Sequence, residues 1–70
     1  MELILSKHAN KRMKERGVDF EKIRDVIDFP DYKISKEDKV EFFKNFGDRV
    51  LRVICVNERK FIKVVTLMWK

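Results

Sequence analysis

The hydrophobic period of this chain changes at Val40, and that change limits the possible folds more than any other feature. Before Val40, apolar residues recur every three or four positions, as they do in helices that lie on a core. After it, they occur in three runs rich in β-branched and aromatic residues, which is typical of strands. These runs are Val40–Phe46, Val50–Val56 and Phe61–Trp69. The sequence therefore predicts helices first and a sheet second.

Two helices are predicted in the first half of the chain. Ser6 suits the N-cap of a helix over about residues 7–16, because its hydroxyl accepts from an amide of the first turn. Gly17 suits the left-handed residue that follows the last turn. Asp19 suits the N-cap of a second helix, which Pro30 ends because the residue before a proline avoids helical geometry.

Turn residues predict how the strands are connected. Gly47-Asp48 suits a two-residue hairpin turn, and Asn57–Lys60 form the second turn. Residues 2–5 and Tyr32–Ile34 are short additional candidates for strands. We therefore expect an α+β fold with two N-terminal helices packed on one face of a three- or four-stranded antiparallel sheet.

The two turns also predict a register. In the first hairpin Phe42 pairs with Val53, and in the second Arg52 pairs with Val65 and Val50 with Leu67. Opposed residues share a face of the sheet, so one face is nearly all apolar and receives the helices. The other, which we call the open sheet face, mixes aliphatic residues with bases and aromatic rings. The bases and rings of interest on it are Phe43, Arg52, Lys63 and Trp69.

Length and composition exclude several classes of site. Seventy residues suffice for one small domain, so we expect residues 1–70 to form a single unit. A single cysteine, Cys55, excludes an internal disulfide, which fits a reducing cytoplasm. With one histidine, a Cys/His zinc site within the chain is not expected either. We therefore expect no metal, no cofactor, no membrane span and a cytoplasmic location.

The charge is positive and unevenly distributed. The net charge is +5, which favours an acidic partner, nucleic acid first. Ser6–Gly17 has five bases and one acid, hence +4. Asp19–Asp31 has two bases and five acids, hence −3, and Lys44–Lys63 has six bases and two acids, hence +4. The positive charge thus lies on the first helix and the later strands.

The open sheet face is a candidate RNA-binding surface. Arg52 and Lys63 are diagonal neighbours in the predicted register, with Phe43 beside Arg52 and Trp69 near the end. Cations hold phosphates, and aromatic rings stack on unpaired bases. Two alternatives stay open. One is a half-solvated sheet whose bases extend over apolar neighbours, and the other is an interface with a second copy or another protein.

His8 and Arg12 form a candidate catalytic pair. Their spacing of four residues puts them on one side of the first helix. Metal-independent cleavage of RNA needs a base for the 2′-hydroxyl proton and fixed positive charge near the phosphorane, which histidine and arginine supply. The alternative is that His8 is an ordinary surface residue near a helix start.

Arg16 and Thr66 are assigned structural roles. Leu5, Ala9 and Met13 form the apolar stripe of the first helix, and Arg16 falls within it. We therefore expect Arg16 to be partly buried and paired with an acid or with backbone carbonyls. Thr66 falls on the apolar sheet face, where its hydroxyl needs a partner.

The segment Lys7–Val18 and the later Val64-Val65-Thr66 resemble a family of small prokaryotic domains of unassigned function, which is similar to the RelE/BrnT-like ribonuclease toxins. The shared pattern is Lys-His-Ala, Arg-Met and Glu-Arg-Gly-Val, and the resemblance covers about residues 5–68. It implies two helices on an antiparallel sheet. It also implies motif positions, which are His8, Arg12, Arg16 and Thr66. In RelE-like toxins the RNA lies on the basic sheet face away from the helices.

These observations lead us to expect a metal-independent endoribonuclease of toxin type. It would act on RNA or on ribosomes and be held inactive by an antitoxin protein. The alternative is a non-catalytic RNA-binding or protein-interaction domain of the same fold. A homodimer is a further option, because the open sheet face carries aliphatic side chains.

Overall fold

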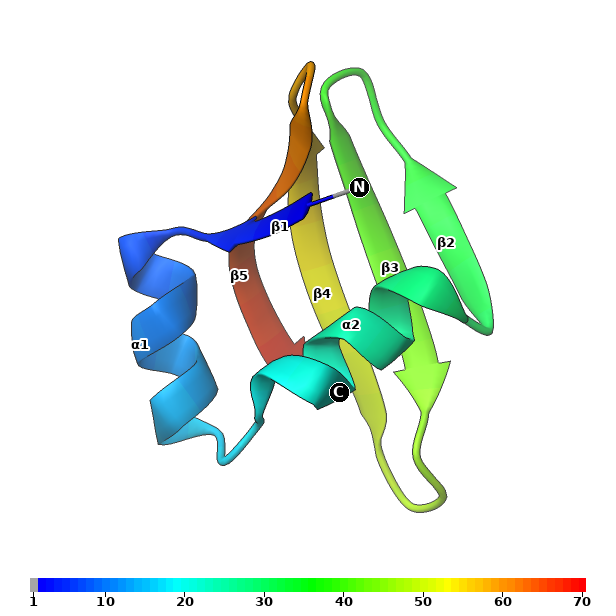
Figure 1. Cartoon of the computed structure of the whole chain (residues 1–70). Helices are drawn as coiled ribbons and strands as arrows, with labels where there is room; N and C mark the ends of the chain where they lie inside the picture. The colour runs from blue at the N-terminus through cyan, green and yellow to red at the C-terminus, as the bar shows by residue number, and fades with distance from the viewer. Residues whose placement is uncertain (1) are drawn as a thin grey trace.

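The computed structural model describes residues 2–70, which form one five-stranded mixed sheet and two helices (Figure 1). The elements in chain order are β1 (Glu2–Leu5), α1 (Lys7–Glu15), α2 (Phe20–Asp28), β2 (Tyr32–Ser35), β3 (Lys39–Asn45), β4 (Val50–Asn57) and β5 (Phe61–Trp69). The strand order is β1-β5-β4-β3-β2. The pair of β1 and β5 is parallel, whereas the other three pairs are antiparallel.

The expected antiparallel sheet of three or four strands is wrong, because β1 adds a parallel strand. Leu3 pairs with Ile62 and Leu5 with Val64. A parallel pair needs a long crossover, and here the two helices and the strands β2 to β4 lie between the partners in the chain. No turn joins these two strands directly. The sequence therefore predicts residues 2–5 as a candidate strand but does not indicate which strand they pair with.

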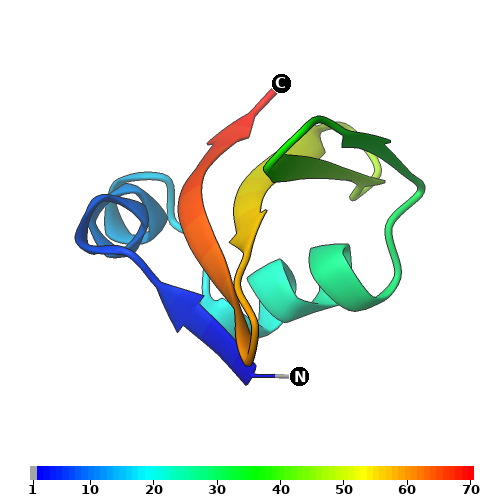
Figure 2. The same cartoon turned by 90° about the horizontal axis from the view of Figure 1, so that it is seen from above.

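The expected packing of both helices on one face is also wrong. Helix α2 covers one face of the sheet over β3 and β4, with Ile23, Val26 and Ile27 buried. Helix α1 instead lies beside β5, past the end of β1, as Figure 2 shows from above. The amide of Ser6 donates to the carbonyl of Val64 (2.9 Å), which ties the start of α1 to that edge.

Both helix starts have the predicted caps. The hydroxyl of Ser6 accepts from the amide of Ala9 at 3.0 Å, and the carboxylate of Asp19 accepts from the amide of Lys22 at 2.8 Å. Gly17 has a φ of 65°, the left-handed geometry expected after α1. The local signals therefore placed the helix boundaries correctly, although they did not indicate where α1 packs.

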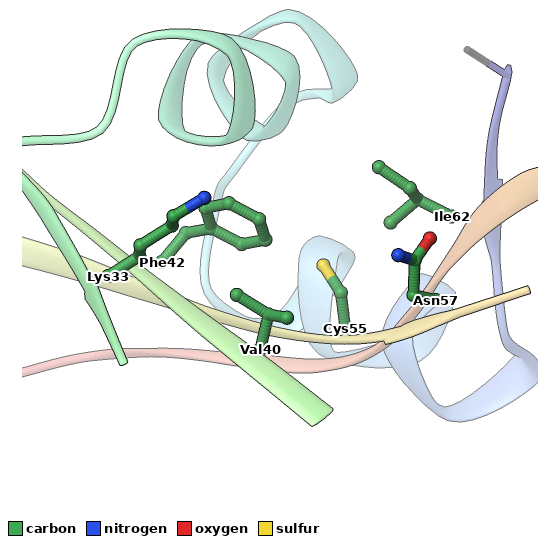
Figure 3. Close-up of a pocket in the computed structure, with 6 residues that line it drawn as sticks. All are labelled: Lys33, Val40, Phe42, Cys55, Asn57 and Ile62. Carbon is green, nitrogen blue, oxygen red and sulfur yellow. The ribbon is translucent and has the colours of Figure 1, made fainter. Parts of the chain in front are cut away.

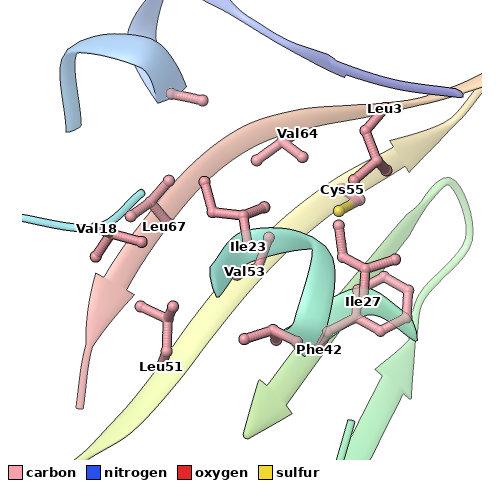
Figure 4. Close-up of a cluster of buried hydrophobic side chains, with 12 residues drawn as sticks. Leu3, Val18, Ile23, Ile27, Phe42, Leu51, Val53, Cys55, Val64 and Leu67 are labelled. Atoms are coloured by element: carbon pink, nitrogen blue, oxygen red, sulfur yellow. The ribbon is translucent and has the colours of Figure 1, made fainter. Parts of the chain in front are cut away.

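The core lies between α2 and the sheet (Figure 4). Alternate residues of β4 point into it, since Leu51, Val53 and Cys55 are all almost fully buried. Each fully buried aliphatic side chain contributes about 1.5–3 kcal/mol relative to its exposed state. The cluster consists of Leu3, Ala9, Val18, Ile23, Val26, Ile27, Phe42, Leu51, Val53, Cys55, Val64 and Leu67.

The register of the first hairpin is confirmed, whereas that of the second is wrong. Phe42 pairs with Val53, as predicted. The second turn is centred one residue later than expected, since the amide of Glu58 donates to the carbonyl of Phe61. A register shift between Ile54 and Cys55 adds a further displacement.

The corrected register moves the four residues 66–69 between faces, and Thr66 and Trp69 are the two with predicted roles. Thr66 pairs with Ile54 and lies on the open sheet face, not in the core. Trp69 pairs with Leu51 and packs at the border of the core, not on the open sheet face.

We expect Ser6→Ala to lower the free energy of unfolding by about 1–2 kcal/mol. The Ser6 hydroxyl accepts from Ala9 and donates to the carbonyl of Val65 at 3.1 Å, so it joins α1 to β5. Denaturant unfolding measures the loss. Ser35→Ala, at an exposed position of β2, is the matched control and should change stability by less than about 0.5 kcal/mol. Equal effects of the two substitutions would contradict this role for Ser6.

Candidate functional site

The structure brings His8 and Arg12 together on the exposed side of α1. The Nε of Arg12 donates to Nε2 of His8 at 3.3 Å, and its Nη1 lies 2.7 Å from Oε1 of Glu15. The three residues follow each other at helical spacings of four and three, so one helical face holds them all. Helix α1 faces the core with Ala9 and Met13, which turns this polar triad toward solvent.

The hydrogen bonds define the chemical state of the triad. Nε2 of His8 accepts, so the neutral imidazole carries its hydrogen on Nδ1. The hydrogen bond from Arg12 holds the pKa of Glu15 below its ordinary value, which keeps Glu15 ionised at neutral pH. Arg12 has five N–H donors, and these two contacts use two of them. Its guanidinium can therefore bind a further anion.

Arg16 does not lie where the apolar stripe predicts it. Helix α1 ends at Glu15 and Arg16 is its C-cap, with an exposed side chain. Arg16 lies beyond the last residue of α1, so the helical spacing that put it in the apolar stripe no longer applies to it. The backbone carbonyl of Arg16 does have a partner, because it accepts from Nε1 of Trp69 at 3.3 Å. The expectation of a partly buried guanidinium at Arg16 is therefore wrong.

The four residues predicted for RNA on the open sheet face do not form one site. Arg52 and Phe43 lie close together, with the guanidinium carbon 5.9 Å from the ring centroid. Lys63 pairs with Val56, four positions along β4 from Arg52. Trp69 belongs to the other side of the sheet. The predicted diagonal contact between Arg52 and Lys63 is therefore wrong, and the second-hairpin register is the cause.

Phe43 is also covered by its neighbours. Only 3% of it is exposed, although it lies on the face away from α2. Tyr32 stacks on it, with ring centroids 4.5 Å apart and planes 10° from parallel. A base cannot reach the Phe43 ring unless Tyr32 moves, so Tyr32 is the accessible aromatic residue here, with 50% of it exposed.

Glu41 neutralises the charge of Arg52, and sequence analysis missed it. Oε1 of Glu41 accepts from Nε of Arg52 at 2.8 Å, and Oε2 lies 2.9 Å from Nζ of Lys36. Hydrogen bonds from Lys36 and then Arg52 hold the pKa of Glu41 below its ordinary value. Glu41 pairs with Ile54 and Phe43 with Arg52, so Glu41 and Arg52 are diagonal neighbours. The correctly predicted first hairpin already contained this signal.

A hollow of about 200 Å³ opens on the side of the sheet that faces α2 (Figure 3). Its lining residues are Lys33, Val40, Phe42, Cys55, Asn57 and Ile62. Burial raises the pKa of the Cys55 thiol to about 12, so the thiol stays protonated and unreactive at neutral pH. This mostly apolar hollow has no activated nucleophile and no acid–base pair.

Among residues 2–70, no three or more histidine, cysteine, aspartate or glutamate side chains are grouped so that they could hold a metal ion. Within the same range, neither helix has the length and apolar character required to cross a bilayer.

Comparison with known proteins identifies one family. Residues 5–69 match the model of a domain of unknown function, DUF4258. No curated protein and no solved structure matches the chain.

We expect Glu41→Gln to destabilise the protein at neutral pH but not in acid. A lowered carboxyl pKa adds stability above the ordinary value of 4.5, and this stability is lost as the pH falls through the lowered pKa. The difference in unfolding free energy between wild type and variant should therefore be largest above that value and should shrink below it. Denaturant unfolding at several pH values measures this difference. Glu37→Gln, at an exposed neighbouring position, is the control. A pH-independent difference for Glu41→Gln would contradict the assignment.

Proposed function

Since the chain belongs to the DUF4258 family of domains of unknown function, we propose a function from its own geometry: a metal-independent endoribonuclease of toxin type. The observation that carries the proposal is the contact between Arg12 and His8 on the exposed side of α1. The resemblance of this helix motif to the RelE/BrnT-like toxins supports the same reaction class.

The pair supplies the two functions that RNA cleavage requires. A phosphate of the RNA attracts the Arg12 guanidinium, whose remaining N–H groups donate to the phosphate oxygens. As Arg12 turns toward the phosphate, it releases Nε2 of His8, and the free lone pair takes the proton of the 2′-hydroxyl. The 2′-oxygen then bonds to phosphorus while the bond to the 5′-oxygen breaks. A proton from water completes the leaving 5′-hydroxyl.

Glu15 and Arg12 have different electrostatic roles in this proposal. Ionised Glu15 holds one end of the guanidinium at 2.7 Å, so Arg12 stays on the same side of α1 as His8. Arg12 places positive charge where the phosphorane gains negative charge, and such stabilisation accounts for a large part of catalysis in many enzymes. Glu15 is therefore a positioning residue, whereas His8 and Arg12 are the proposed catalytic residues.

The charge of α1 favours this helix over the open sheet face as the place where RNA binds. Lys7, Lys11 and Lys14 are exposed on α1, and clustered bases of this kind attract a polyanion. Within the described residues none of these three lysines is in an ion pair, whereas on the open sheet face Glu41 pairs with Arg52. We therefore propose that the RNA follows α1.

A specific observation supports the alternative of a protein-interaction domain. Strand β2 is an edge strand whose four residues are all exposed, and it carries the apolar side chains of Tyr32 and Ile34. An unpaired strand edge of this kind can accept a strand from another chain. An antitoxin protein is the partner that this edge would take if the toxin proposal holds.

We expect His8→Ala to lower the RNA cleavage rate by about 10²–10⁴-fold and to leave RNA binding intact. The substitution removes the proposed base, whereas binding depends on the surrounding cations. Cleavage of single-stranded RNA and of ribosome-bound RNA, with EDTA present, measures the effect. Asn10→Ala, exposed on the same helix, is the control. Cleavage that is equally fast in His8→Ala would refute the role of His8, and a wild-type protein that binds RNA without cutting it would favour the alternative.

We expect Arg12→Ala to reduce the cleavage rate much more than Lys11→Ala does. The two substitutions remove the same charge from adjacent positions, but only Arg12 contacts His8. If the pair acts as a unit, the double variant His8→Ala/Arg12→Ala should lose less than the product of the two single losses. Rate constants for the four proteins test this. Equal losses in Arg12→Ala and Lys11→Ala would reduce Arg12 to a general contributor of charge.

A further inference from the structure

A second group of cations surrounds the only tryptophan of the chain. The guanidinium carbon of Arg49 lies 4.0 Å from the centroid of the Trp69 ring. The Nζ of Lys22 lies 5.8 Å from the same ring and 5.2 Å from the ring of Phe46. The two rings meet edge to face, with centroids 6.1 Å apart. We call Lys22, Phe46, Arg49 and Trp69 the Trp69 cluster.

The Trp69 cluster joins four parts of the fold. Lys22 comes from the first turn of α2, Phe46 and Arg49 flank the turn between β3 and β4, and Trp69 ends β5. The indole also donates to the carbonyl of Arg16 at the end of α1. In Figure 1 the end of α1, the start of α2, the end of β5 and the turn between β3 and β4 all lie in the lower half of the molecule. The cluster therefore lies between the end of α1, the proposed catalytic helix, and the turn between β3 and β4.

The two cations of the cluster are held by rings and not by acids. Arg12, Arg24 and Arg52 each pair with a carboxylate, but among residues 2–70 neither Lys22 nor Arg49 takes part in an ion pair. The nearest acids in sequence are Glu21 and Asp48, and within the described residues neither forms an ion pair with Lys22 or Arg49. Aromatic contacts hold a cation in place without cancelling its charge. Among residues 2–70, the Trp69 cluster thus presents two positive charges that are not bound in an ion pair with a carboxylate.

The geometry points to a phosphodiester group as the ligand. A guanidinium that lies on an indole ring keeps its N–H edge free, and that edge matches two phosphate oxygens. Lys22 adds a second charge next to the same rings. We infer that the Trp69 cluster binds the phosphate backbone of single-stranded RNA and anchors the strand that α1 is proposed to cleave.

The position of the cluster relative to His8 fits one RNA strand that touches both. His8 and Arg16 are eight residues apart on α1 and its cap, which is roughly 12 Å along the helix axis. A few nucleotides span this distance. The inference rests on the proposed function for the identity of the substrate, but the anchoring contact can be tested in a binding measurement without any cleavage.

Titration of the full chain with a short oligouridine tests the anchor, with the fluorescence of Trp69 as a local reporter. Binding should change this fluorescence, because the negatively charged phosphate then lies next to the cations that contact the indole ring. Arg49→Ala should weaken binding by about tenfold or more, the loss typical of one charge-assisted contact. It should also lower the slope of log affinity against log salt by about one unit. Arg49→Lys keeps the charge but lacks the planar fork, so it should recover part of the affinity.

Arg59→Ala is the matched control. It removes the same residue type from the other exposed turn, between β4 and β5, at the opposite end of the sheet (Figure 1). We expect it to weaken binding by only about twofold, as a loss of distant charge. Equal effects of Arg49→Ala and Arg59→Ala, or RNA binding that leaves the fluorescence unchanged, would overturn the inference. So would a fluorescence response to an oligoglutamate peptide but not to oligouridine, which would indicate an acidic protein as the partner.

Failure of this inference can be told apart from failure of the proposed function. If the wild type never cleaves RNA but Arg49→Ala selectively weakens binding, the ribonuclease proposal fails and the anchor stands. If His8→Ala abolishes cleavage while Arg49→Ala and Arg59→Ala bind alike, the anchor fails alone. The melting temperature of Arg59→Ala should match that of the wild type, and that of Arg49→Ala should be only slightly lower, through the loss of one exposed cation–π contact.

Discussion

The parallel pairing of β1 with β5 determines where the basic helix lies. β1 covers the edge of β5 only from Phe61 to Val64, and α1 continues along the part of the edge that remains. Ser6 stabilises the turn from β1 into α1. Its amide and its hydroxyl both donate to carbonyls of β5, and its hydroxyl oxygen also caps α1. As a result α1 buries only its narrow apolar stripe and keeps its bases in solvent.

The positive charges of the open sheet face differ in their surroundings from those of α1 and the Trp69 cluster. On the open sheet face, Arg52 is bound to the buried carboxylate of Glu41, which in turn binds Lys36. This network links β3 and β4 to the turn after β2, and its one carboxylate offsets one of the two positive charges. On α1, Arg12 contacts both Glu15 and His8, whereas within the described residues the three lysines of the helix are in no ion pair. In the Trp69 cluster, Lys22 and Arg49 contact aromatic rings. The surface that α1 shares with the Trp69 cluster is therefore better suited to a polyanion than the sheet.

Local signals predicted the local structure well. Ser6, Gly17 and Asp19 marked the helix ends, and Gly47-Asp48 determined the register of the first hairpin. Sequence analysis failed where the outcome depends on distant or cooperative contacts. Nothing near residues 2–5 indicates that they pair with β5. The register shift near Ile54, which no sequence pattern marks, moved Trp69 to the other face. The predicted proximity of His8 and Arg12 is unaffected by these register errors, because both residues lie on one helix.

The most direct test of where RNA binds is a map of backbone amide chemical shifts during titration with a short oligouridine, since a chain of 70 residues gives a resolvable NMR spectrum. If the account is correct, the largest shift changes follow α1 from His8 to Arg16 and continue into the turn before Arg49 and the end of β5. The amides of β2 and of β3 around Phe43 should stay nearly unchanged. Shift changes centred on Tyr32, Phe43 and Arg52 would contradict the account and return the RNA to the open sheet face.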